Sequence, residues 1–428
     1  MDEEFLQYIW ANSLFKSREY ITSRGEKIRI LHVGKQNRDA GPDFSHAKIE
    51  VNGIIEVGSV EVHLRESDWM RHGHQLDAAY DNVILSVTEI ADKTVYTRGG
   101  HLVRTIEIDY PEQIWVEYLF LKGAPVSPRC YRHLPSIDPS RLQMLLGAYG
   151  VKRLERKCEE IREALLRTRN DWEACFYQWV TRYWSGNVNT DAFSYLAGNL
   201  SYKQILRSSD SLFSVEALLL GFSGLLQAEG EADEYLQQLR KEYDYLEAKF
   251  HLQSMQASRW KFMRIRPYVF PTVRLALLAA LLYRSQFLFS ALMEASSISE
   301  VEHLLDATAS SYWDTHFQFN SPSSHRVKRI GKNIKQVIIT NAIIPFLFLY
   351  GKERSEEHFC EKALQWLEEL PPEENHITRQ WKLHGISFRS ASLTQSLLHV
   401  QKEYCDEHRC LHCNIGHEVF RIVTEKVL

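Results

Sequence analysis

The sequence lacks a large excess of either charge. Its 428 residues include 51 Lys and Arg and 55 Asp and Glu, which leaves a formal net charge of −4. No global field therefore attracts nucleic acid or an anionic membrane, and either would have to bind at local patches. With 44% hydrophobic residues, 20 Gly and 12 Pro, the composition excludes collagen-like, coiled-coil and disordered classes. The length allows two or three domains.

Long uninterrupted apolar runs are also missing. The most apolar segments, residues 275–292 and 337–350, are broken by polar residues or proline and fall short of a membrane span, so we expect both to be buried helices. The first ten residues are acidic and have neither the basic nor the apolar region of a secretion signal. We therefore expect a cytoplasmic protein without membrane association.

Common nucleotide and nucleophile motifs are absent as well. The sequence contains no Gly-x4-Gly-Lys-Ser/Thr loop, no Gly-x-Gly-x-x-Gly after a strand and no Gly-x-Ser-x-Gly elbow. The sequence therefore contains none of the motifs that would indicate a nucleotide-driven motor or a dehydrogenase.

The pattern of the chain changes near residue 125. Before it, a helix is expected at 3–15, followed by a β-rich stretch in which Asn52-Gly53 is a strong hairpin signal. A short helix or loop is expected at 67–80. The expected strands lie at 27–33, 47–51, 54–64, 82–88, 93–98 and 101–108.

After a proline-rich linker, long segments with helical periodicity follow, for example at 141–166, 171–184, 232–250 and 271–292. The predicted fold class is α+β. We expect an α/β domain over 1–125, a large all-helical domain over 126–404, and a Cys/His-rich tail over 405–428 packed on the helical domain.

Two carboxylates of the first domain are candidates for a metal site. Asp43 follows a Gly-Pro turn just before a strand, and Glu61 lies on the next strand with His63 on the same face. If the two strands fold back on each other, Asp43 and Glu61 converge into a hard oxygen site that suits Mg²⁺ or Mn²⁺. The alternative is that Asp43 caps the strand entrance and Glu61 lies on a solvated face.

The sequence Gly-Pro-Asp at 41–43, a hairpin, and then Glu-Val-His at 61–63 resemble the metal site of PD-(D/E)XK nucleases. The resemblance implies an αβββαβ core in which Asp43 and Glu61 hold divalent metal. In those enzymes a Lys two residues after the Glu orients or activates the attacking water. His63 stands at that position here, and it can act as a base or a ligand but carries no fixed charge.

The whole chain is also identified as a member of an uncharacterised bacterial family of about this length, a domain of unknown function. The shared stretches include DAGPDF at 39–44, GSVEVHLRESDW at 58–69, HGHQLDAAYDNVILSV at 72–87 and RPYVFPTVRLALLAALL at 266–282, together with the Cys-rich tail. The resemblance implies the domain layout and no activity.

Further potential ligands follow Glu61 closely. His72, His74 and Asp77 are expected to form a second shell around the carboxylate site. His63, His72 and His74 alternatively predict a zinc centre with an open position for water, although loop histidines are more often surface groups.

The tail places Cys405, Cys410 and Cys413 within nine positions. In a reducing compartment this density favours structural zinc or an iron–sulfur cluster over disulfides. No further Cys follows Cys413, so the fourth ligand would be a nearby His or the distant Cys130. Three buried free thiols are the alternative.

Two basic segments interleave cations with aromatic residues, which is typical of surfaces that neutralise phosphates and stack bases. The alternative is ordinary ion pairing on helical faces. The candidate nucleic-acid-binding residues are Arg259, Lys261, Arg264 and Arg266 in the first segment and Arg326, Lys328, Arg329 and Lys332 in the second.

These features predict a metal-dependent phosphodiesterase that acts on nucleic acid, with Asp43, Glu61 and His63 in the catalytic site and the helical domain positioning the substrate. Two other interpretations stay open. One is a non-catalytic scaffold that binds nucleic acid or protein through a degenerate nuclease fold, and the other is a zinc-dependent hydrolase.

Overall fold

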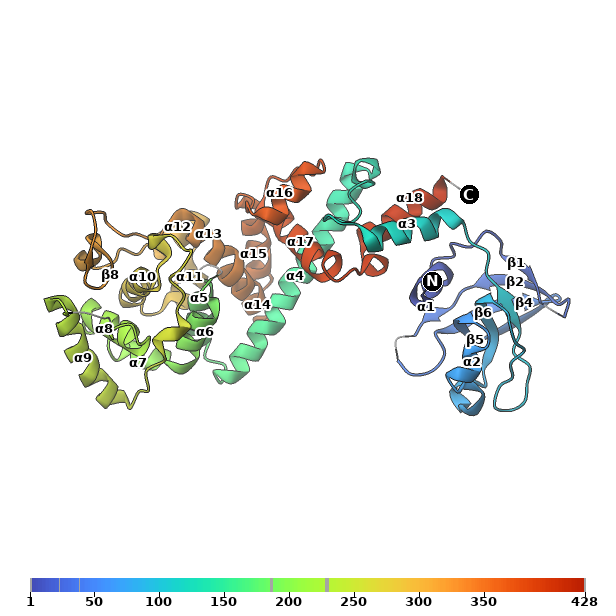
Figure 1. Cartoon of the computed structure of the whole chain (residues 1–428), viewed down its shortest axis with the longest axis horizontal. Coiled ribbons are helices and arrows are strands. Elements are labelled where there is room, and N and C mark those ends of the chain that lie inside the picture. The colour runs from blue at the N-terminus through green and yellow to red at the C-terminus, as the bar shows by residue number, and fades with distance from the viewer. Residues whose placement is uncertain (1, 23, 38, 185–187, 228–230, 427–428) are drawn as a thin grey trace. The chain divides into compact units, whose positions relative to one another are not determined.

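The computed structural model describes residues 2–22, 24–37, 39–184, 188–227 and 231–426 (Figure 1). The chain divides into two compact units. Unit 1 comprises Met1–Leu146, Asn375–Ser387 and Leu397–Leu428, and unit 2 comprises Gly147–Glu374 and Phe388–Ser396. This division differs from the expected boundaries at 125/126 and 404/405, because C-terminal segments, the cysteine tail among them, belong with the sheet and not with the helices of unit 2.

Unit 1 is built on a mixed seven-stranded sheet with the order β1-β2-β4-β5-β6-β7, in which β3 also pairs with β4. The strands from β1 to β5 pair antiparallel, whereas β5, β6 and β7 run parallel. The strands are β1 (Glu19–Ile21), β2 (Lys27–His32), β3 (Lys35–Gln36), β4 (Phe44–Val51), β5 (Ile54–Arg65), β6 (Val83–Ile90) and β7 (Thr105–Glu107).

The turn between β4 and β5 forms as predicted. Asn52 has φ 48° and Gly53 has φ 88°. Both values are positive, which a two-residue turn needs if its twist is to match that of the flanking strands. The expected strand at 93–98 does not form. Tyr96 makes only an isolated bridge with Leu102, because the following segment pairs with β6 as strand β7.

Unit 1 also contains helices, of which α1 and α2 pack against strand β5. They are α1 (Glu3–Ala11), α2 (Asp68–Arg71), α3 (Glu112–Gly123), α16 (His376–Leu383) and α18 (Asn414–Glu425). Helix α1 begins where the Asp2 carboxylate accepts a hydrogen bond from the backbone N–H of Phe5, and it buries Phe5, Leu6, Ile9 and Trp10 completely. Helix α18 lies beside α3 in Figure 1. The hydroxyl of Tyr8 on α1 is 3.0 Å from Nδ1 of His417 on α18.

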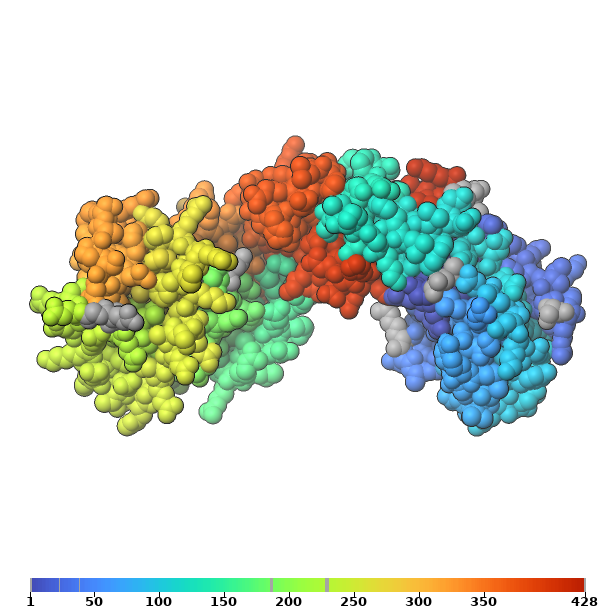
Figure 2. Space-filling model, viewed as in Figure 1, coloured from blue at the N-terminus to red at the C-terminus, as the bar shows by residue number. Residues whose placement is uncertain are grey.

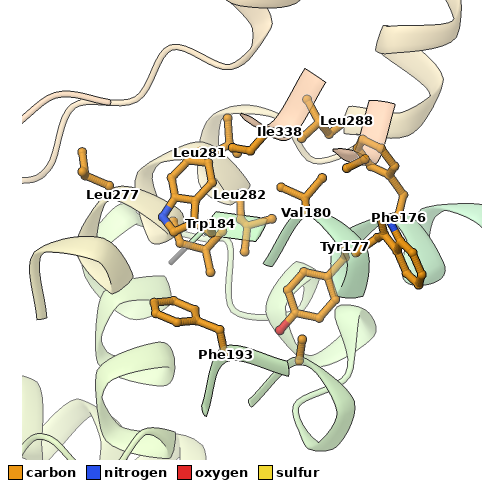
Figure 3. Close-up of a cluster of buried hydrophobic side chains, with 14 of the residues drawn as sticks. Phe176, Tyr177, Val180, Trp184, Phe193, Leu277, Leu281, Leu282, Leu288 and Ile338 are labelled. Atoms are coloured by element: carbon orange, nitrogen blue, oxygen red, sulfur yellow. The ribbon is translucent and has the colours of Figure 1, made fainter. Parts of the chain in front are cut away.

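Unit 2 is mainly helical, as expected. Its core joins Trp184 and Phe176 of α5 to Phe193 of α6 and to Leu281 and other leucines of α10 (Figure 3). Its helices are α5 (Trp172–Trp184), α6 (Thr190–Asn199), α7 (Tyr202–Leu206), α8 (Leu212–Phe222), α9 (Glu234–Phe250), α10 (Pro271–Arg284), α11 (Leu288–Glu294), α12 (Ile298–Leu304), α13 (Lys332–Ile338), α14 (Ile344–Arg354) and α15 (Glu357–Glu369).

Two elements span the division between the units, namely α4 (Pro139–Arg167) and α17 (Ala391–Val400). The prediction of an all-helical second domain was wrong in one detail. Strands β8 (His316–Gln318) and β9 (Ser321–Pro322) form a small antiparallel sheet around Asn320, whose φ of 56° permits a tight reversal.

The two apolar segments noted in the sequence are buried helices in unit 2, as expected. The single helix expected at 271–292 is instead the pair α10 and α11, bent by 67° at the polar residues between them. The helical stretch Lys332–Arg354 is long and apolar enough to cross a membrane, but 72% of its apolar window is buried inside the structure. Core helices of soluble proteins pass the same length and composition test.

Candidate functional site

The structure brings Asp43 and Glu61 together across the β4–β5 pair. Phe44 pairs with Val60, so the preceding residue, Asp43, lies opposite Glu61. Oε2 of Glu61 accepts a hydrogen bond of 2.9 Å from the backbone N–H of Asp43, and Oδ2 of Asp43 accepts one of 3.0 Å from the N–H of Val62. These two reciprocal bonds hold both carboxylates at the same point on the sheet.

Burial makes this carboxylate pair electrostatically unusual. Glu61 is only 4% exposed, and burial together with the charge of Glu61 raises the pKa of Asp43 to about 7. The solvated strand face considered for Glu61 is therefore not what the structure shows. Two carboxylates this close to each other, one of them buried, are a candidate for a functional site.

Helix α1 contributes two polar side chains that the sequence analysis missed. Nε2 of Gln7 donates a 2.9 Å hydrogen bond to Oδ1 of Asp43. Burial and then the charge of Glu61 raise the pKa of Glu3. Glu3 and Gln7 are four residues apart, so they share one face of the helix. The buried Trp10 follows Gln7 at helical spacing, so the two polar residues border the apolar face of α1, and this was the signal available in the sequence.

His63 lies next to Glu61 on the same face of β5, as predicted, and it is fully buried. Its Nε2 is 3.7 Å from Oε1 of Glu61. Within the described part of the chain, neither of its ring nitrogens has a hydrogen-bond partner. Burial, and then the neighbouring His74 and His72, lower the pKa of His63 to about 3. The imidazole is therefore neutral at pH 7 and does not supply the positive charge that a Lys would.

The structure folds His72 and His74 back onto His63. His72 ends helix α2, and Gly73 has φ 79°, a conformation that reverses the chain at low cost only for glycine. The ring centroids lie 5.3 Å (His63 to His72) and 5.2 Å (His63 to His74) apart. One nitrogen from each of the three rings can be chosen so that all lie within 4.8 Å of one another.

Aromatic side chains form the wall behind these histidines. Tyr80 stacks on His74 with ring centroids 3.8 Å apart, and the wholly buried Trp69 contacts the edge of His74 at 5.3 Å. Asp77 lies outside this group. It is exposed, and its Oδ1 accepts a hydrogen bond from the N–H of Ala79, so it caps the following turn.

The fold brings Cys130 to the three cysteines of the tail. All four thiols are buried and free of disulfides. Nε of Arg129 donates a 2.7 Å hydrogen bond to the backbone carbonyl of Cys405. Burial raises the pKa of Cys405 and of Cys410 to about 12. Burial also raises the pKa of Cys130, and the charges of Cys405, Cys413 and Cys410 raise it further. Structural zinc or iron–sulfur at these residues stays a prediction.

The two basic segments meet in unit 2. The guanidinium of Arg326 lies 4.7 Å from the ring centroid of Tyr268, and the yellow and orange parts of this unit adjoin in Figure 2. Lys328 differs from the expectation, because it is 1% exposed and its Nζ donates to the backbone carbonyl of Asp314. The other seven candidates are exposed: Arg259, Lys261, Arg264, Arg266, Arg326, Arg329 and Lys332.

The fold and the site thus define a mixed-sheet protein with a cluster of two carboxylates and three imidazoles at neighbouring strands and at the turn after α2. The chain belongs to the family described as protein of unknown function (DUF2851), whose model matches residues 3–376. The matched range includes the whole cluster, whereas the tail cysteines lie beyond it. No curated protein and no solved structure matches the chain.

Proposed function

We propose that this protein is a metal-dependent phosphodiesterase that acts on nucleic acid. The observation that carries the proposal is the close pair of the half-buried Asp43 and the buried Glu61, which are linked by reciprocal backbone hydrogen bonds. A divalent cation such as Mg²⁺ or Mn²⁺ held there would lower the pKa of a bound water and stabilise the charge that develops during in-line displacement at phosphorus.

The order of elements in unit 1 supports the resemblance to PD-(D/E)XK nucleases. Leaving out the short β1 and β3, the chain runs α1, β2, β4, β5, α2, β6, which is the αβββαβ order that the resemblance implies. Asp43 precedes the second of these strands and Glu61 lies on the third. This order supports the proposal that both carboxylates are the metal ligands of such a motif.

The neutral state of His63 changes the role that this position plays. A Lys would neutralise charge near the attacking water, whereas a neutral imidazole offers a lone pair. We assign His63 to holding either the cation or its water, and we leave charge neutralisation to the cation itself.

The exposed cations of unit 2 support contact with a polynucleotide. Arg264 and Arg266 lie in the same segment as Tyr268, which Arg326 of the second segment covers. Exposed guanidinium groups beside aromatic rings match the chemistry of phosphates and bases. Binding through them would weaken steeply as salt increases.

Cleavage of labelled DNA and RNA by the purified full chain with Mn²⁺ or Mg²⁺ tests the proposal. Asp43→Asn keeps the size of the side chain but removes a ligand charge, so cleavage should fall at least about a hundredfold, equivalent to about 3 kcal/mol of transition-state stabilisation. The matched control is Asp77→Asn, which alters an exposed capping carboxylate of the same unit and should retain activity.

The scaffold interpretation predicts a different result. It follows from the neutral His63 at the Lys position, which would leave the fold without the chemistry. Calorimetric titration with Mn²⁺ separates the two, since a scaffold should show no binding that Asp43→Asn removes. Equal cleavage by the wild-type chain and by Asp43→Asn would refute the phosphodiesterase assignment.

A further inference from the structure

We propose that His63, His72 and His74, together with Glu61, bind a divalent transition-metal ion such as Zn²⁺. The three imidazoles come from one strand and one turn, and the proposed phosphodiesterase uses only His63 of the three. The inference stands apart from the proposed function, because the imidazoles would bind the ion whether or not the protein cleaves phosphodiesters.

Two of the donor distances are close to those around a tetrahedral ion. Metal–nitrogen and metal–oxygen bonds of about 2.1 Å place neighbouring donors about 3.4 Å apart. Oε1 of Glu61 is 3.2 Å from Nε2 of His74 and 3.7 Å from Nε2 of His63, which brackets that value. His72 is exposed, so its side chain is the one free to rotate and close the remaining gap within the 4.8 Å cluster.

The second observation that points to an ion is that ring nitrogens of His63 and His74 lack a hydrogen bond. Within the described chain, both nitrogens of the fully buried His63 lack hydrogen-bond partners, and so does Nε2 of His74, which is 8% exposed. Buried polar groups are rarely left without a partner, because their desolvation then goes uncompensated. A metal ion would accept one lone pair from each ring, and the second nitrogen of His63 would carry the proton.

The surrounding groups hold the rings in place for ligation. Tyr80 stacks on His74, and Trp69 contacts the same ring. Trp69 is itself held by a 3.1 Å hydrogen bond from its Nε1 to the carbonyl of Tyr96. Imidazole nitrogens prefer Zn²⁺ and its transition-metal neighbours over Mg²⁺. The two oxygens of Glu61 face different groups, Oε2 toward Asp43 and Oε1 toward the imidazoles. Glu61 is therefore placed to connect the two parts of the site.

Titration of the metal-free full chain with Co²⁺ under anaerobic conditions tests the proposal. Co²⁺ bound by nitrogen and oxygen should give visible d–d absorption without the thiolate-to-metal charge transfer that the tail cysteines would produce. His72→Ala should weaken binding at this site at least about tenfold, measured also with Zn²⁺ by equilibrium dialysis and elemental analysis. Because His72 is exposed, this variant should fold. The matched control is His101→Ala, another exposed histidine of unit 1, which should bind normally.

Replacing His72 by a residue that can also bind the metal gives a more specific test. His72→Cys should bind Co²⁺ with one new thiolate charge-transfer band in the difference spectrum. The proposal is overturned if His72→Ala binds as tightly as the wild-type chain and His72→Cys adds no such band. It is equally overturned if all bound metal shows thiolate charge transfer, because the ions then sit only at the cysteines. Loss of nuclease activity plays no part in this readout.

Discussion

At the scale of single residues, Glu66 is a buried acid outside the proposed ligand set. It is 0% exposed, and its Oε2 accepts a 2.9 Å hydrogen bond from the hydroxyl of Ser86 on β6. Its Oε1 has no hydrogen-bond partner among the described residues. Burial, only partly offset by hydrogen bonds from Ser86 and Thr105, raises its pKa from 4.5 to about 7. The folded state therefore favours the protonated form.

We therefore expect Glu66→Gln to raise the free energy of unfolding by an amount that depends on pH. Below pH 4.5 the acid is protonated in both states. As pH rises toward about 7 the unfolded chain loses the proton and the folded chain keeps it, so the free energy of unfolding falls, by about 3 kcal/mol in total. Gln keeps an acceptor for Ser86 and carries no charge. Denaturant unfolding at pH 4 and pH 8 should show the variant gaining stability over the wild-type chain only at the higher pH.

The exposed Glu19 of β1 provides the matched control, because Glu19→Gln makes the same chemical change at a position that is not buried. A stability difference for Glu66→Gln that does not vary with pH would contradict the assignment of a protonated Glu66.

At the scale of elements, α8 and α9 approach each other unusually closely in unit 2. Gly221 is buried on α8, and a Cβ atom added to it would lie 2.0 Å from Cγ of Tyr243 on α9. The ring of Tyr243 has little freedom to retreat, since it is 6% exposed and its hydroxyl is 2.7 Å from Oγ of Ser254. The absence of a side chain at Gly221 thus sets the spacing of the two helices.

Gly221→Ala should therefore lower the free energy of unfolding of unit 2 by about 1–3 kcal/mol or more, because the core cannot absorb the added methyl group without moving α9. The control is Gly198→Ala on α6. A Cβ there meets nothing within 4 Å, so the better helix propensity of Ala should leave stability unchanged or raise it slightly. Thermal unfolding of both variants checks this. Similar effects in the two variants would rule out close packing as the cause.

At the scale of the whole molecule, neither unit is a continuous piece of chain. Unit 1 needs segments from both sides of unit 2 in the sequence. Helix α18 buries Ile415, Val419 and Phe420 completely, and Phe420 lies 5.2 Å from the ring of Tyr8 on α1. The sheet domain is therefore completed by residues more than 300 positions away in the sequence.

Removal of α18, by ending the chain at Cys413, should loosen unit 1 selectively. Without the apolar face of α18, Tyr8 and the neighbouring surface of α3 lose their cover. Amide hydrogen exchange should accelerate in α1 and α3, while α5, α8 and α10 of unit 2 exchange at wild-type rates. Tyr8→Phe is the milder control, since it removes only the hydrogen bond to His417. Unchanged exchange in α1 would show that α18 does not support the sheet domain.

The sequence predicted those parts of the site that depend on local rules. The Asn52-Gly53 turn and the alternation of side chains along a strand were enough to place Asp43 opposite Glu61 and His63 beside it. The contribution of Gln7 was missed, because it depends on how α1 packs on the sheet. The closeness of His74 to His63 depends on the left-handed backbone of Gly73, which periodicity does not reveal.

Long-range proximity was harder still to predict. The sequence offered Cys130 only as one option for joining the tail cysteines, and the fold makes them neighbours through contacts such as that of Arg129 with Cys405. The hairpin around Asn320 and the bend between α10 and α11 depend on how unit 2 fills its core, which local propensity does not determine.

The interleaving of the two units also sets an order of events during synthesis on the ribosome. Residues 1–146 emerge first, but residues 397–428, which complete their unit, emerge only after the 147–374 stretch of unit 2 has been translated. Most of unit 2 can therefore assemble on the nascent chain while the sheet still lacks its last helix, and the remaining segment of unit 2, Phe388–Ser396, emerges just before residues 397–428. The part of the protein that carries the candidate site is begun first and finished last.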